Sequence, residues 1–221
     1  MKRFALLAFL AALCANNIAL AAEEDSGLWA TVAMSKVLAE RVTAAMVFQL
    51  RLNDDVDRRE RALLRPSLSY RVDPSQMLTL GYDAHFINTS NDKVEQRLWQ
   101  QYQLSRQYSD ISASLRLRLE QRFIDHVDGV PVRLRIKPAL KIPFNNSPWF
   151  FTVSNEFFVA FNDVDGGQLD GYHENRAYLG FGRTLGEGVA GQIGYQNQFI
   201  ERARRDAVTH QLFVGISFKL P

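Results

Sequence analysis

Charged residues alternate with aliphatic ones along residues 114–123, SLRLRLEQRF, in a pattern that can bind ions. Arg116, Arg118, Glu120 and Arg122 occupy every second position, with leucines between them. Because side chains alternate across a β-strand, this spacing predicts one charged face and one aliphatic face. Guanidinium groups on one face attract anions or pair with carboxylates, so the question is what each face contacts.

Catalytic and metal chemistry have weaker support. The histidines are His85, His126, His173 and His210, and His126 and His173 lie in or beside expected loops. A lipid-hydrolysing site would need a serine motif near such a histidine, and none accompanies them. The Asp-rich segment 162–171 lacks the complete calcium-loop pattern. We therefore predict that the protein is not an enzyme, with no catalytic residues, no metal site and no cofactor.

The N-terminus predicts export. Lys2 and Arg3 precede a short apolar run, and Ala19-Leu20-Ala21 supplies small residues for cleavage, so residues 1–21 are expected to be a signal peptide. Residues 22–221 would then form a single domain, and Cys14 would be lost with the signal. Removing Lys2 and Arg3 lowers the 26 basic residues to 24, which equals the 24 acidic residues. This balance and the lack of a recognition motif predict no nucleic-acid partner.

Alternation of apolar and polar residues continues from about residue 28 to the end. We expect strands at residues 28–37, 40–52, 60–72, 77–87, 94–105, 110–124, 130–143, 149–161, 172–184, 189–200 and 207–219. These segments are long enough for tilted membrane strands, which need about 9 to 11 residues. Short connections at 73–76, 106–109, 145–148 and 185–188 alternate with generally longer or more charged ones at 53–59, 88–93, 125–129, 162–171 and 201–206. The pattern predicts an antiparallel up-and-down transmembrane β-barrel of 10 to 12 strands. An even number, ten or twelve, is expected, with segment 28–37 unassigned.

The alternation also assigns the two faces of the barrel. Leu115, Leu117 and Leu119 should face lipid, and the charged residues between them should face the lumen. The expected lumen charge network comprises Glu95, Arg97, Arg116, Arg118, Glu120, Arg122, Arg133, Arg135, Lys137, Glu156, Glu174 and Arg176, and further inward charges are Arg51, Arg65, Arg71, Lys141 and Asp83. The lumen should therefore be net basic. Two interpretations remain open: a track that attracts anions, or a salt-bridged packing of a narrow barrel.

The order of several strings resembles one bacterial family. GLWATVAMSKVL, LRPSLSYRV, EQRLWQQYQL, LRLRLEQRF, VRLRIKPALKIPF, FFTVSNEFFVAFND and ENRAYLGFGRTL follow one another as in the domain of unknown function 2490 (DUF2490) family. The resemblance covers nearly all of the chain after the signal peptide. It implies an outer-membrane β-barrel with no assigned activity, and no catalytic residues to transfer.

These patterns predict a barrel in the bacterial outer membrane with a structural or passive-transport role, including a narrow anion-preferring channel. The alternatives are a rim-sited lipid-modifying enzyme and a soluble periplasmic ligand-binding barrel. Expected partners are outer-membrane lipid, lipopolysaccharide and the barrel-assembly machinery. Many outer-membrane barrels end in an aromatic residue, whereas this chain continues from Phe218 to Pro221.

Overall fold

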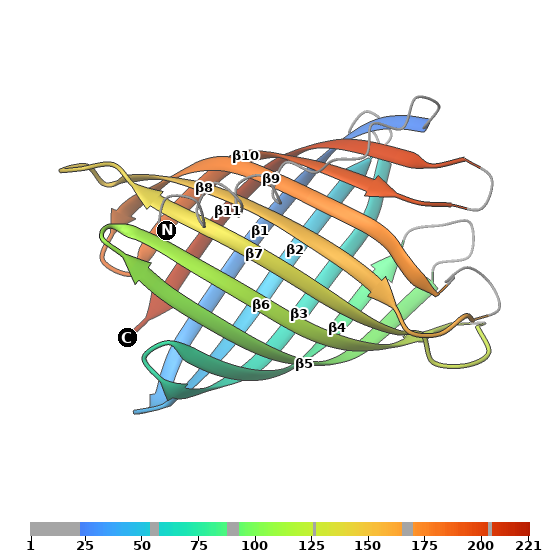
Figure 1. The fold of residues 1–221 in the computed structure, drawn as a ribbon, viewed down its shortest axis with the longest axis horizontal. Helices are drawn as coiled ribbons and strands as arrows, with labels where there is room; N and C mark the ends of the chain where they lie inside the picture. The colour runs from blue at the N-terminus through green and yellow to red at the C-terminus, as the bar shows by residue number, and fades with distance from the viewer. Residues whose placement is uncertain (1–22, 54–57, 88–92, 126, 165–169, 203–204) are drawn as a thin grey trace, which may run out of the picture.

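The computed structural model describes residues 23–53, 58–87, 93–125, 127–164, 170–202 and 205–221. These residues form an all-β closed barrel of eleven strands (Figure 1). The strands are β1 (Glu23–Ala39), β2 (Val42–Asn53), β3 (Arg58–Asp73), β4 (Gln76–Ile87), β5 (Lys93–Tyr108), β6 (Ile111–Ile124), β7 (Val132–Pro143), β8 (Trp149–Ala160), β9 (Gly171–Gly186), β10 (Val189–Ile200) and β11 (Ala207–Leu220). Within the described chain, no helix is both long enough and apolar enough to cross a membrane.

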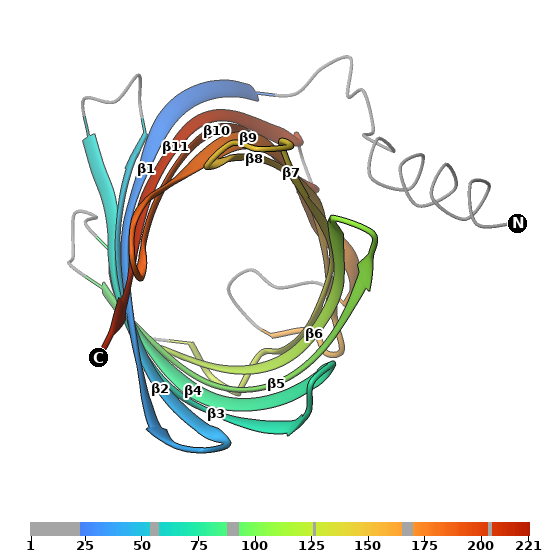
Figure 2. The same cartoon turned by 90° about the vertical axis from the view of Figure 1, so that its left-hand side faces the viewer.

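The barrel closes through a parallel pair. Each strand from β1 to β10 pairs antiparallel with the next one along the chain. The first and last strands, β1 and β11, pair in parallel, so that Trp29 lies opposite Phe213. The strand number falls within the expected range of 10 to 12, but the expectation of an even number is wrong. Segment 28–37 is the middle of β1, which fills the gap between β2 and β11. Parallel pairing lets an odd number of strands close without leaving an exposed edge (Figure 2).

The strand connections differ between the two ends of the barrel. At one end, which we call the short-turn end, residues 40–41, 74–75, 109–110 and 187–188 make tight turns, and 144–148 make a slightly longer one. Asp73 supports one turn by accepting hydrogen bonds from the backbone N–H and hydroxyl of Ser75, both at 2.7 Å. The other end, the long-loop end, carries the remaining connections. The expected signal peptide and His126 lie outside the described residues. The same holds for four acids of the expected connections 53–59 and 162–171, namely Asp54, Asp55, Asp57 and Asp165.

The outward face is apolar over most of the described strands. Phe48, Leu80 and Leu212 are 45%, 56% and 49% exposed, although each lies in the middle of a long strand. Their neighbours on the alternate positions point into the lumen, and many of these are polar and buried. The polar interior and apolar exterior reverse the arrangement of an ordinary water-soluble β-protein.

Several aromatic rings lie against glycines on the inner wall. A Cβ atom at Gly81 would overlap the Trp99 ring, and one at Gly182 would overlap the Phe150 ring. In each case the glycine lies directly opposite the aromatic residue in the register of two neighbouring strands. The missing side chain therefore lets a large ring lie close to the neighbouring strand.

Candidate functional site

The charged residues of the lumen come from β2 to β9 and lie mainly in the half of the barrel nearer the long-loop end. The register between β6 and β7 places Arg116 opposite Lys137, Arg118 opposite Arg135 and Glu120 opposite Arg133. These pairs alternate with leucine and isoleucine on the outward face. The alternation in the sequence therefore positions the basic side chains of neighbouring strands next to one another, and acids must lie between them to compensate.

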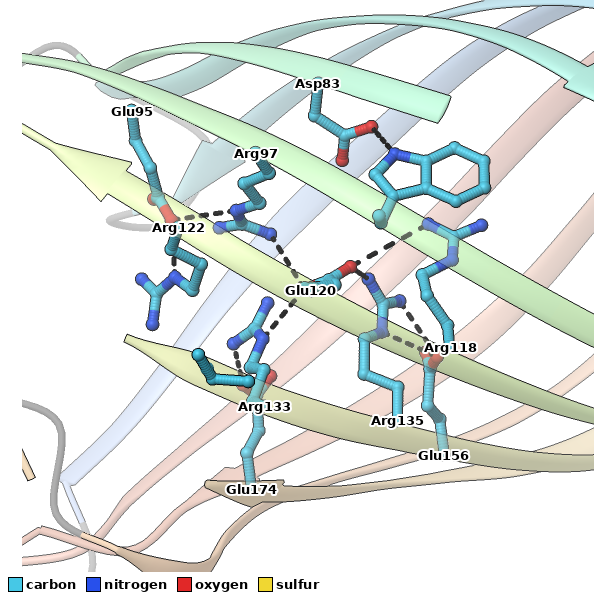
Figure 3. Close-up of polar contacts among 12 residues, drawn as sticks. Asp83, Glu95, Arg97, Arg118, Glu120, Arg122, Arg133, Arg135, Glu156 and Glu174 are labelled. Carbon is cyan, nitrogen blue, oxygen red and sulfur yellow. Dashed lines mark hydrogen bonds and ion pairs between the residues drawn. The ribbon is translucent and has the colours of Figure 1, made fainter. Parts of the chain in front are cut away.

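Glu120 is the centre of this charge network (Figure 3). Its carboxylate accepts hydrogen bonds from Arg135 Nη1 at 2.6 Å and Arg133 Nε at 2.8 Å. Arg97 Nη1 and Arg118 Nη1 lie 3.7 and 3.8 Å from its two oxygens. The Glu120 side chain is 0% exposed. A carboxylate buried this completely requires several charged donors, and three strands supply them.

Glu95 makes a second centre nearer the long-loop end. Arg97 Nε and Arg122 Nε donate to the same Glu95 oxygen at 2.8 and 2.5 Å, and Arg61 Nη1 lies 3.7 Å from the other oxygen. Arg97 thus contacts both Glu95 and Glu120. This shared arginine joins the two centres into one network across β3, β5 and β6.

Two further acids extend the network to β8 and β9. Glu156 accepts hydrogen bonds from Arg116 Nη2 at 2.5 Å and from Arg135 Nε at 2.9 Å. Glu174 lies 2.5 Å from Arg176 Nη2. Arg133 Nη1, 3.8 Å from Glu174, connects this pair to Glu120. Eleven of the twelve residues of the expected network therefore form ion pairs with one another.

Lys137 is the remaining member of that set. It lies on the same face of β7 as Arg133 and Arg135 and opposite Arg116 in the register, but none of the ion pairs above includes it. Its charged neighbours include both Arg116 and Glu156. Lys137 therefore adds positive charge to the described part of the lumen.

Asp83 forms a separate cluster that sequence reasoning assigned only in part. Arg65 donates to both carboxylate oxygens at 2.7 Å, Trp99 Nε1 donates at 2.6 Å, and His85 Nε2 lies 3.3 Å away. Arg65 and Asp83 were expected in the lumen, whereas Trp99 and His85 were not assigned roles. His85 on β4 and Trp99 on β5 occupy inward positions in the same alternation. Assigning the uncharged inward residues as well as the charged ones would therefore have identified both.

Glutamines line the inner face of β10 and β11, next to the part of the charge network on β9. Gln196 donates to Gln211 at 2.5 Å, Gln211 donates to Gln198 at 3.0 Å, and Gln198 donates to Glu174 at 2.7 Å. This chain of amides crosses β9, β10 and β11. It was missed because glutamine gives no charge signal in the sequence.

A cavity of about 690 Å³, which we call the vestibule, lies at the long-loop end of the lumen. Its position follows from its lining, because Arg51 is near the end of β2, Arg61 near the start of β3 and Arg122 near the end of β6. The charged residues that line it are the arginines Arg51, Arg61, Arg97, Arg122, Arg133, Arg176 and Arg202 and the acids Glu23, Glu24, Asp25 and Glu174. Basic side chains therefore outnumber acidic ones around the vestibule.

The inward positions nearer the short-turn end are mostly small and neutral. They include Ala45 on β2, Ser67 on β3, Thr79 on β4 and Ser114 on β6. Phe150 also lies in this half, against Gly182 of the neighbouring strand. Lys141, whose Nζ lies 3.8 Å from the Phe150 ring centroid, is a charged exception, so the short-turn half carries fewer charges than the long-loop half.

The described histidines are in three different settings. His85 is fully buried beside Asp83, and His210 shares a 2.6 Å hydrogen bond with Tyr195 on the outward face. His173 lines the vestibule and packs against Phe158, with ring centroids 6.3 Å apart. Across the described chain, His, Cys, Asp and Glu side chains form no group of three or more that could hold a metal ion.

These features define the class of the protein as a closed all-β barrel with an apolar exterior and a charged lumen. The family model described as "Protein of unknown function (DUF2490)" matches residues 26–209, and the chain belongs to this family. This finding confirms the family resemblance that the strand sequences indicate. An uncharacterized protein of Methylorubrum extorquens is 29% identical over 199 residues, which cover 86% of each chain.

Proposed function

We propose that this protein is an outer-membrane β-barrel that passively admits small anions through its lumen. Its strands are 12 to 17 residues long, which exceeds the roughly 9 to 11 residues that a tilted strand needs to cross the hydrocarbon layer. Exposed Phe48, Leu80 and Leu212 suit contact with lipid tails. The closed backbone hydrogen bonding also suits a lipid environment, because lipid cannot form hydrogen bonds with free N–H and C=O groups.

The observation that carries the anion preference is the excess of arginine around the vestibule. Seven arginines line this cavity with only four acids. Rings of basic side chains at a pore favour anions, because the local potential raises the anion concentration and repels cations. Solutes entering from the long-loop end would meet these arginines before reaching the short-turn half of the lumen.

A structural role is the second candidate, and the burial of Glu120 favours it. Four arginines from β5, β6 and β7 lie within 3.8 Å of its carboxylate. Such a network packs and rigidifies the wall of a narrow barrel even when no solute crosses it. On this view the vestibule is a closed recess.

Conductance in a planar lipid bilayer distinguishes the two candidates. The protein is refolded in detergent, and heat-modifiable gel mobility establishes that the barrel has formed. Anion-selective conductance steps support passage through the lumen, whereas a folded but electrically silent barrel contradicts transport and favours the structural role. Fractionation of cells expressing the full chain tests the location. Recovery in the soluble periplasmic fraction would overturn the membrane assignment.

A further inference from the structure

Two tryptophans in the lumen have similar arginine contacts. The Cζ atom of Arg51 lies 3.8 Å from the ring centroid of Trp29, and that of Arg118 lies 3.7 Å from the ring centroid of Trp99. Both tryptophans are buried, with 5% and 2% of their surface exposed. In each case a guanidinium group packs on the π-face of the indole and leaves the indole N–H for another partner.

Around Trp99 that partner is a carboxylate. Trp99 Nε1 donates to Asp83 Oδ1 at 2.6 Å, and Arg65 binds both oxygens of the same group. The lumen therefore contains one complete example of a carboxylate held by an indole N–H and a guanidinium. This example shows which ligand chemistry suits such a pair of donors.

Around Trp29 the corresponding donors have no such acceptor. No acceptor within the described ranges reaches Trp29 Nε1, and the same holds for Arg176 Nε. The Cζ atom of Arg176 lies 5.1 Å from the Trp29 ring centroid, and Arg176 is only 9% exposed. Two buried donors are thus close together without acceptors, which is unfavourable unless another group binds there.

Two of the three side chains at this position line the vestibule. Arg51 and Arg176 both line that cavity, whose volume of about 690 Å³ is large enough for a small organic ligand. Glu174, the acid that pairs with Arg176, also binds Arg133 and Gln198. Its oxygens are therefore already engaged by other donors.

We propose that Trp29, Arg51 and Arg176 bind the carboxylate group of a small organic anion, as Trp99 and Arg65 bind Asp83. This inference rests on the proposed function and deepens it, because it names the solute class and the position where the solute binds in the lumen. The indole N–H of Trp29 and Nε of Arg176 donate to the carboxylate, and Arg51 adds positive charge beside them.

The test follows the indole N–H signals of the three tryptophans by NMR in the protein refolded in detergent. Sodium acetate is added in increasing amounts, and a parallel series uses sodium chloride at the same ionic strength. Inorganic phosphate is added in a separate series. Acetate should shift the Trp29 signal saturably and leave the Trp99 signal unchanged, because Asp83 already occupies the Trp99 N–H. Trp29→Phe assigns the signal. If that variant does not fold, Trp99→Phe and Trp149→Phe assign it by elimination.

Arg176→Lys keeps the charge but removes Nε, so it should weaken acetate binding about tenfold. Arg183→Lys is the matched control, since Arg183 is exposed and packs on Trp149 away from the vestibule. Equal shifts with acetate and chloride, or equal affinity in both variants, would overturn the site. Saturable binding of phosphate without acetate binding would overturn the carboxylate assignment.

The same measurements separate this site from the proposed function. Saturable acetate binding at Trp29 in a barrel without anion-selective conductance overturns the transport role and leaves the site in place. Anion-selective conductance without an acetate-specific shift at Trp29 overturns the site and leaves the transport role in place.

Discussion

Replacing Glu120 by glutamine should destabilise the barrel strongly. Arg135 and Arg133 bond to different oxygens of the carboxylate, at 2.6 and 2.8 Å. A glutamine keeps one oxygen and places an NH₂ group against the other arginine, so one donor loses its acceptor. It also removes a negative charge that lies within 3.8 Å of all four arginines, Arg97, Arg118, Arg133 and Arg135. Removing one partner of a buried ion pair costs about 3–5 kcal/mol, and we expect a loss of unfolding free energy in this range.

Equilibrium unfolding by urea, with the protein refolded into lipid vesicles, measures this effect. The matched control is Glu23→Gln, since Glu23 lies 3.8 Å from Arg202 and is 59% exposed. Exposed ion pairs contribute little to stability, so this control should unfold like the unmodified protein. A Glu120→Gln variant that unfolds at the same urea concentration as the Glu23→Gln control would refute the assignment of Glu120 as the centre of the network.

Three further predictions concern closure, packing and selectivity. Gly81→Ala should cost about 1–3 kcal/mol of unfolding free energy because the new methyl group overlaps the Trp99 ring, whereas Gly186→Ala, with open space around it, should cost much less. Urea unfolding measures both variants, and equal losses of unfolding free energy would contradict the overlap. Arg122→Gln removes a vestibule charge and should shift the reversal potential of the conductance in the direction of cation selectivity, whereas Arg183→Gln, at an exposed position, should not. Unchanged ion selectivity in both variants would count against the vestibule as the selectivity filter. Deleting β1 exposes the edges of β2 and β11 and should abolish heat-modifiable mobility, while a variant that still folds would show that closure by β1 is dispensable.

The sequence by itself determined the local features of this protein. Alternation along residues 114–123 gives a strand with Leu117 outward and Arg118 inward, because successive side chains of a strand point to opposite faces. The same rule placed the expected network residues in the lumen. Turn residues such as Asp73 and Gly188 marked the connections at the short-turn end, where Gly188 has a positive φ of 71°. These features depend only on neighbouring residues.

Only the tertiary structure decided how the strands close and which charges pair. The parallel pairing of Trp29 with Phe213 joins opposite ends of the chain, and an alternating pattern carries no information about partner or direction. Likewise, alternation places Glu120 inward but does not show that arginines from three strands converge on it. That convergence depends on the register and curvature of the closed barrel, which brings side chains from non-adjacent segments within hydrogen-bond distance. For the same physical reason, the place of Trp29 beside Arg51 and Arg176 emerges only once β1 takes its position between β2 and β11.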